Sequence, residues 1–173
     1  GRLNIENRGL YLGSFNADDK IIVFFNDGSY ELTSYDMANR YKMNDIVLIE
    51  KLNLDKIYSL IYKDGKNKKF YIKRFKIETS LMGNRIILIT ENWGSKYILI
   101  SNEPLLNLNY NYRLKNGEKK SKSISVNEFI DIKGYKAIGK VIDSKLRMSG
   151  FKFQSNNDNT NETSKKNEEL TLF

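Results

Sequence analysis

The sequence runs Ile57-Tyr-Ser-Leu-Ile-Tyr62, then Lys63-Asp64-Gly65, then Phe70-Tyr-Ile-Lys-Arg-Phe-Lys-Ile77. The two outer runs are rich in β-branched and aromatic residues, which favour extended strands. The Asp-Gly pair between them tolerates the positive φ that a tight turn between antiparallel strands needs. The stretch therefore predicts a β-hairpin.

Three further segments follow the same plan of a strand-like run, a turn with glycine and a second strand-like run. Their turns are Asn26-Asp27-Gly28, Asn92-Trp93-Gly94 and Asn116-Gly117. Four successive hairpins in about 100 residues are typical of a propeller-like repeat. We expect an all-β fold, a propeller-like disc of four or more hairpin blades. Helix should be confined to short stretches, for which residues 126–130 and 37–43 are the candidates.

The composition changes after residue 153, so residues 1–153 form one predicted domain. Residues 154–169 contain no hydrophobic side chain and cannot bury enough apolar surface to offset the entropy lost on ordering. We expect residues 154–173 to be a disordered polar tail whose apolar end frays; docking of that end onto the body is the alternative. Because the chain begins with Gly-Arg-Leu rather than Met, we expect a fragment of a longer protein.

Several kinds of chemistry have no residues to support them. The chain has no cysteine and no histidine, which removes disulfides, thiolate nucleophiles, the usual zinc sites and the commonest general base. Its 11 tyrosines fall largely in strand-like runs, where they are expected in the core or on a sheet face, and the Asp18-Asp19 pair is expected to be solvated. The longest apolar run, residues 21–25, is too short to span a membrane. We expect a cytoplasmic domain without enzymatic activity or a metal site.

The net charge of +8 is concentrated in two blocks. Residues 56–76 hold 8 basic residues against 1 acidic residue, and residues 113–152 hold 11 against 4. Compositional drift toward lysine would scatter these residues evenly. Two separate blocks instead indicate a functional surface for a polyanionic partner.

Three stretches carry a resemblance to a known family. They are Ile57 to Phe75 with its Tyr-Lys-Asp-Gly turn, Ser95 to Pro104, and Glu128-Phe-Ile-Asp-Ile-Lys-Gly-Tyr-Lys-Ala-Ile-Gly-Lys140. Together they resemble the C-terminal domain of bacterial type IIA topoisomerase A subunits, of the topoisomerase IV kind. The resemblance covers residues 15–150 and implies a β-pinwheel, in which hairpin blades exchange strands with their neighbours. The Gly- and Arg-rich box with which gyrase wraps DNA is absent, since residues 133–140 are a degenerate version, so tight wrapping is not expected.

The resemblance also implies a function and partners. Such a domain binds and bends duplex DNA independently of sequence, and presents DNA segments for strand passage. The parent A subunit is then a nucleoid-associated homodimer that works with a topoisomerase B subunit. Mg²⁺ and ATP are used in other domains or subunits, and no cofactor is expected in this one.

The candidate DNA-binding residues are the cations of the two blocks, because Lys and Arg neutralise phosphates and release counterions. Strand alternation places Arg74 and Lys76 on the opposite face from Lys73, and the glycines of residues 133–140 are expected to let backbone amides approach a phosphate. The full set is Lys66, Lys68, Lys69, Lys73, Arg74, Lys76, Lys133, Lys136, Lys140, Lys145 and Arg147. A protein-interaction module and an RNA-binding β-domain are the alternatives; the latter would need aromatic residues exposed on one sheet face.

Overall fold

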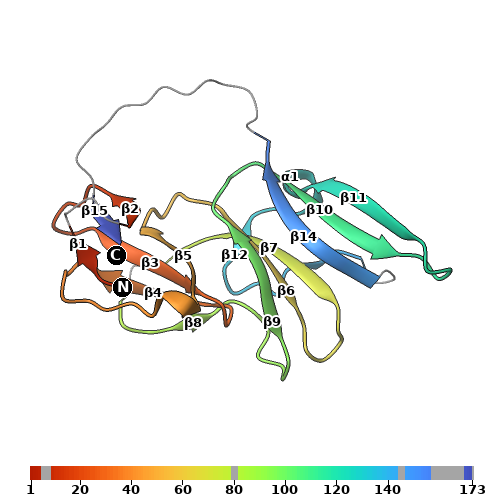
Figure 1. The fold of residues 1–173 in the computed structure, drawn as a ribbon, viewed down its shortest axis with the longest axis horizontal. Helices are drawn as coiled ribbons and strands as arrows, with labels where there is room; N and C mark the ends of the chain where they lie inside the picture. Colours follow the sequence, from red (N-terminus) through yellow and green to blue (C-terminus); the bar gives the residue numbers. More distant parts are fainter. Residues whose placement is uncertain (5–8, 79–81, 144–146, 157–169, 173) are drawn as a thin grey trace. The chain divides into compact units, whose positions relative to one another are not determined.

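A computed structural model describes most of the chain, namely residues 1–4, 9–78, 82–143, 147–156 and 170–172. The chain divides into two compact units, which are coloured by sequence in Figure 1. Unit 1 comprises residues 1–54, 79–88 and 161–173. Unit 2 comprises residues 55–78 and 89–160.

Unit 1 contains a four-stranded sheet of order β5-β3-β4-β8 and a three-stranded sheet of order β1-β15-β2. The strands of the larger sheet are β3 (Lys20–Phe25), β4 (Ser29–Ser34), β5 (Ile46–Lys51) and β8 (Ile86–Ile87). Those of the smaller sheet are β1 (Leu3–Asn4), β2 (Leu10–Gly13) and β15 (Leu170–Leu172). A 3-10 helix, η1 (Met43–Asp45), precedes β5.

Unit 2 contains a five-stranded sheet, in which β12-β7-β6-β9 are joined by β13 on β7, and a three-stranded sheet of order β11-β10-β14. The first sheet consists of β6 (Tyr58–Lys63), β7 (Phe70–Lys76), β9 (Lys96–Ser101), β12 (Lys133–Gly134) and β13 (Lys140–Val141). The second consists of β10 (Leu106–Arg113), β11 (Lys119–Ser125) and β14 (Arg147–Ser155). The short helix α1 (Val126–Phe129) follows β11.

Three sheets share one plan. The hairpins β3–β4, β6–β7 and β10–β11 each receive a third strand, β5, β9 or β14, against their first strand. Short strands from later in the chain then pair with the second strand of two hairpins: β8 pairs with β4, and β12 and β13 pair with β7. This topology agrees with the strand exchange that the family resemblance implies.

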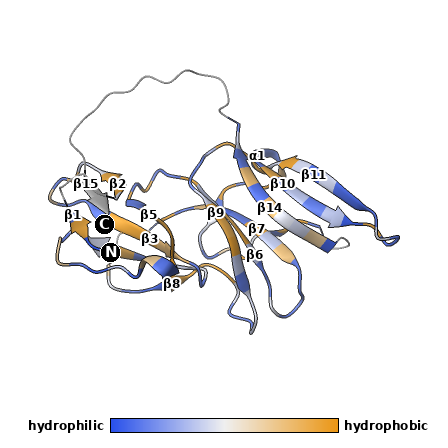
Figure 2. Cartoon of the chain, viewed as in Figure 1, coloured by the Kyte–Doolittle hydropathy of each residue, from blue (hydrophilic) through white to orange (hydrophobic). Residues whose placement is uncertain are grey.

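Each unit has its own apolar core. β3 is apolar on both faces and buried along Ile21–Phe25, which Figure 2 shows as an orange strand. β10 instead alternates, so that Leu106, Leu108 and Tyr110 enter the core of unit 2 while the residues between them face outward. The hairpin formed by β10 and β11 is accordingly blue toward its tip. Among the residues that the structure describes, no helix is long and apolar enough to cross a membrane.

The all-β prediction is confirmed. Tyr30, Tyr58 and Tyr62 lie in the core and are at most 1% exposed, whereas Tyr11 on β2 is 45% exposed. The hairpin expected around Trp93 is wrong. Its two arms belong to different sheets, because β8 pairs with β4 and β9 pairs with β6. The backbone N–H and C=O groups of each arm therefore form hydrogen bonds with an edge strand of an existing hairpin rather than with the other arm.

The expected tail also differs from the structure at both of its ends. β14 continues to Ser155, two residues beyond the expected boundary. Leu170–Leu172 is not frayed but forms β15, which pairs with β1 and with β2. An inserted strand removes the unpaired edges that two short strands would otherwise leave. Residues 157–169 lie outside the described residues, so the disorder expected for them stays a prediction.

Candidate nucleic-acid interface

The positive charge of the chain belongs to unit 2. By sequence, unit 1 holds 9 Lys and Arg against 11 Asp and Glu, a net charge of −2. Unit 2 holds 20 against 10, a net charge of +10. The two basic blocks of the sequence therefore fold into one compact body.

A hollow of about 380 Å³ in unit 2 brings the two blocks together. Its cations are Lys63, Lys68 and Lys69 of the β6–β7 hairpin and Arg147 at the start of β14, with Asp143 also in the lining. We call this the basic hollow. Among the described residues, neither the two loop lysines nor Arg147 forms an ion pair, and all three are exposed. Unpaired cations in a concavity raise the local concentration of anions.

A row of three cations crosses the adjoining sheet. Arg113 of β10 lies directly opposite Lys119 of β11 on one side and Arg147 of β14 on the other. Residues directly opposite each other in antiparallel strands share a face, so the three side chains are neighbours. We call them the cationic row. Like charges so placed repel one another, and an anion lying across them would relieve that repulsion.

Sequence reasoning missed Arg113 and Lys119, although the signal was present. The Asn116-Gly117 turn had been identified, and a tight turn there forces residues on either side into register. The N–H of Leu114 donates to the carbonyl of Glu118 and the N–H of Gly117 donates to the carbonyl of Leu114, both at 2.9 Å. The next residues away from the turn, Arg113 and Lys119, therefore lie opposite each other.

The loop that carries Lys66, Lys68 and Lys69 is built on a buried carboxylate. Asp64 is 2% exposed, and its Oδ2 accepts hydrogen bonds from the backbone N–H groups of Lys66 (3.0 Å) and Asn67 (2.8 Å). Its Oδ1 accepts from the hydroxyl of Thr90 and from Nδ2 of Asn92 (2.7 Å). These hydrogen bonds, with that of Thr90 the largest contributor, hold the pKa of Asp64 well below its usual range.

The remaining loop contacts fix the backbone around the lysines. Lys68 adopts a left-handed conformation with φ of 62°, a conformation uncommon for a residue with a side chain. Asn67 supports it on both sides: its Oδ1 accepts from the backbone N–H of Lys69 at 2.9 Å, and its Nδ2 donates to the hydroxyl of Tyr71 at 2.7 Å. Because the backbone is already ordered, binding an anion costs only the ordering of the lysine side chains.

Lys73 was predicted to bind DNA, and this prediction is wrong. The side chain is 3% exposed, and its Nζ donates a hydrogen bond to the backbone carbonyl of Tyr135 at 2.6 Å. Burial lowers the pKa of this ammonium group to about 8. Alternation did place Lys73 on one face with Phe75, over whose ring Nζ lies at 5.4 Å. That face points into unit 2, where the lysine fastens the segment of residues 133–141 to β7.

The same segment carries three other predicted cations, and the structure gives them different surroundings. Lys133 and Lys136 are exposed. Lys140 is exposed as well, but its Nζ donates to the carbonyl of Phe129 at 2.9 Å and lies 4.1 Å from the centre of that ring. At Gly139, which has φ of 99°, a Cβ would lie 2.5 Å from the carbonyl oxygen of Ile72, so this glycine lets two backbone segments pack closely.

The remaining predicted residues are placed as follows. Lys66 is exposed on its loop and Lys76 is half-buried on β7. Arg74 is half-buried and donates from Nη2 to the carbonyl of Pro104 at 3.1 Å, so its guanidinium is already engaged. Lys145 lies outside the described residues. No group of three or more acidic residues is placed to hold a metal ion in the described part of the chain.

Comparison with known proteins gives one family. The family model described as "Topoisomerase C-terminal domain, Bacteroidota" matches residues 2–146. No curated protein and no solved structure gives a significant match.

Proposed function

Since the chain belongs to the family of topoisomerase C-terminal domains of Bacteroidota, we propose that unit 2 binds duplex DNA without regard to sequence and bends it. The observation that carries this proposal is the continuity of unpaired cations in one body. Arg147 belongs both to the basic hollow and to the cationic row, so cations from a hairpin loop and from three strands form one surface. Contacts to several phosphates along such a surface favour a duplex that curves to follow it.

The polar residues beside the cationic row support binding without base readout. On the outer face of the same sheet, Nδ2 of Asn109 donates to Oε1 of Gln154 at 3.1 Å, and the hydroxyl of Ser121 donates to Oδ1 of Asn111 at 2.8 Å. Amide groups that pair with their neighbours are not free to form the bidentate contacts with base edges that specify sequence. Affinity should therefore come from phosphates.

The wider role follows from the family. We propose that the parent protein is an A subunit of the topoisomerase IV kind, which forms a homodimer and works with a B subunit during ATP- and Mg²⁺-dependent strand passage. In that setting this domain presents DNA segments to the cleavage machinery elsewhere in the enzyme and serves chromosome segregation in the nucleoid.

The alternative of an RNA-binding sheet has less support. Such domains stack unpaired bases on aromatic residues exposed along one sheet face. The outward positions of β10 are instead Asn107, Asn109, Asn111 and Arg113, while Tyr110 is buried. A protein-interaction module would leave the charge difference between the two units without a role.

A salt titration of binding tests the proposal. The 173-residue chain is titrated against a labelled duplex of arbitrary sequence at several salt concentrations, as wild type and with Lys68→Glu, Lys69→Glu and Arg147→Glu combined. Each phosphate contact adds about 0.9 to the slope of log affinity against log salt, so the triple variant should lose about 3 from that slope. Its affinity should fall by the same factor for unrelated duplexes.

The matched control reverses three exposed cations of unit 1: Arg2→Glu, Arg40→Glu and Lys42→Glu. This variant has the same net charge as the first, and it should retain a slope close to that of the wild type. Equal losses in the two variants would show that only total charge matters, and the proposed site would be abandoned. A preference for single-stranded RNA over duplex DNA would favour the RNA-binding alternative.

A further inference from the structure

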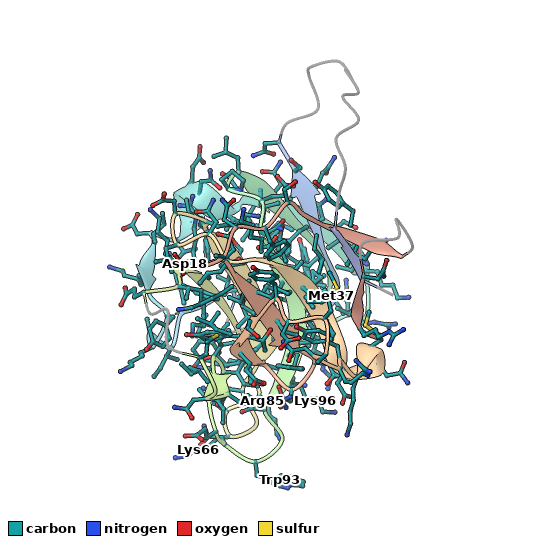
Figure 3. The ribbon with its side chains drawn as sticks, turned by 90° about the vertical axis from the view of Figure 1, so that its left-hand side faces the viewer. Asp18, Met37, Lys66, Arg85, Trp93 and Lys96 are labelled. Carbon is teal, nitrogen blue, oxygen red and sulfur yellow. The ribbon has the colours of Figure 1, made fainter. Side chains whose placement is uncertain are left out.

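Trp93 is the sole tryptophan of the chain and is 92% exposed. Figure 3 shows its side chain projecting beyond the end of the loop that leads into β9. Burying a large apolar side chain stabilises the folded state, and Trp93, being almost fully exposed, contributes very little of that stabilisation. A turn at this position needs only small polar residues and glycine. The exposure of the ring is therefore better explained by binding to a partner than by folding.

The backbone that carries the ring is fixed. The N–H of Ser95 donates to the carbonyl of Asn92 at 3.0 Å, and the hydroxyl of Ser95 accepts from the N–H of Gly65 at 2.9 Å. The carbonyl of Trp93 packs so closely on Gly65 that a Cβ there would lie 1.9 Å from its oxygen. An exposed ring on an ordered turn is preorganised to meet a partner.

Lysines lie on the loop next to that of Trp93, and the same buried carboxylate positions both loops. Asp64 accepts from Nδ2 of Asn92, next to Trp93 in the chain, and from the backbone N–H of Lys66. The Nζ of Lys68 lies 3.9 Å from the point that a Cβ on Gly94 would occupy. An aromatic face and ammonium groups are thus held side by side on two interlocked loops, and Figure 3 shows Lys66 on the loop next to that of Trp93.

We propose that Trp93 stacks on a DNA base exposed at an unpaired or kinked step, while Lys66 and Lys68 hold the flanking phosphates. This inference rests on the proposed function, since it concerns the DNA that unit 2 binds. Every base offers a π-face, so stacking adds affinity without specifying sequence. Proteins that bend a duplex commonly insert an apolar side chain at the kinked step, where the base faces open.

Because Trp93 is the sole tryptophan, its fluorescence reports the proposed contact directly. The 173-residue chain is titrated with an intact duplex, with the same duplex carrying a central bulge, and with single-stranded DNA, while anisotropy of the labelled DNA measures total binding. Stacking on a base should quench the emission, most strongly for the bulged duplex. Saturating anisotropy with unchanged emission on all three DNAs would overturn the inference.

Two variants separate stacking from a merely structural role. Trp93→Ala should lose about tenfold in affinity for the bulged duplex and much less for the intact one, since only a distorted step offers a free base face. Trp93→Phe, which keeps an aromatic face, should recover most of the loss. The control is Tyr11→Ala, which removes an exposed aromatic residue of unit 1 and should change neither affinity.

The failures of the two proposals look different. If the wild type binds no duplex at low salt, the proposed function itself is wrong. If it binds, and Trp93→Ala binds bulged and intact duplexes as the wild type does, only the role of Trp93 is wrong. The exposed ring would then be assigned to a protein surface.

Discussion

The two units of the chain use the same turn in opposite ways. Asp27-Gly28 closes the β3–β4 hairpin of unit 1, and Asp64-Gly65 begins the turn of the β6–β7 hairpin of unit 2. The Asp27 side chain is 52% exposed and pairs with Arg85 at 3.3 Å. Asp64 is buried and organises two loops through hydrogen bonds. The turn aspartate of unit 1 thus forms an exposed ion pair, whereas that of unit 2 is buried and fixes the two loops that carry Lys66 and Trp93.

Cations differ between the units in the corresponding way. In unit 1, Lys51 pairs with Asp19 at 3.1 Å, as Arg85 does with Asp27. In the described part of unit 2, the loop lysines and the cationic row have no such partner. The same hairpin plan thus carries cations in ion pairs in unit 1 and cations without ion pairs in unit 2. The function is indicated by where the unpaired charge lies and not by the fold.

A third contrast lies inside the sheets. Leu32 of β4 and Lys73 of β7 occupy corresponding positions: each lies two residues after a tyrosine that faces an aromatic residue across its hairpin. Both are almost fully buried, at 2% and 3% exposed. Unit 1 uses an apolar side chain there, whereas unit 2 uses a lysine that reaches the carbonyl of Tyr135.

The largest effect is expected from removing the two turn carboxylates. Asp64→Ala leaves the donors from Thr90, Asn92 and two backbone N–H groups without their acceptor, and unpaired buried donors are costly. We expect its melting temperature to fall by roughly 10 °C. Asp27→Ala removes an exposed ion pair with Arg85 and the acceptor of two hydrogen bonds from Ser29, against four donors at Asp64, and should therefore lose fewer degrees. Similar losses in thermal denaturation would remove the contrast between the two turns.

An intermediate effect concerns Lys73 and pH. Burial lowers its pKa from 10.5 to about 8, so between these values the unfolded chain holds more protons than the folded protein. Wild-type stability should therefore rise as pH increases above 8, and should gain nothing from this group below 8. Lys73→Leu, which installs the side chain of unit 1, should lack that rise in urea unfolding measured up to about pH 9.5.

The control for this measurement is Lys76→Leu, a half-buried lysine on the same strand. It should keep the rise seen in the wild type. If Lys73→Leu retains the rise, another group causes it, and Lys73 is not the distinguishing feature of the unit 2 sheet.

Much of the structure could be predicted from local sequence signals, whereas the pairings between distant segments could not. Asp64-Gly65 and Asn116-Gly117 identified their hairpins because turn chemistry depends on adjacent residues. The partner of Ile86–Ile87 depends on the open edge of β4, more than 50 residues earlier, which no local pattern records. The burial of Lys73 likewise depends on Tyr135, which lies 62 residues away in the sequence. The sequence identifies the two basic blocks, and a closed disc of hairpins would bring them together, but which of their cations meet in the basic hollow depends on the fold.

The smallest effect is expected from substituting Arg113. This substitution tests whether the charge of the cationic row contributes to DNA binding at a cost in folding stability. Arg113→Glu places a carboxylate between Lys119 and Arg147, so two repulsive cross-strand pairs become attractive. Each such pair contributes about 0.2–1 kcal/mol, and the variant should be more stable by about 1 kcal/mol in urea unfolding. Its duplex affinity should fall, with a salt slope smaller by about 1. Asn107→Glu adds a carboxylate to the same face of β10 near its other end, opposite Ser125 and Gln154 and away from these cations, and should give no gain in stability. A loss of stability in Arg113→Glu with unchanged affinity would mean that the row is held by other contacts. A gain in stability with a loss of binding would show that unit 2 keeps the repulsion within the cationic row, at a cost in stability, because those cations bind an anionic partner.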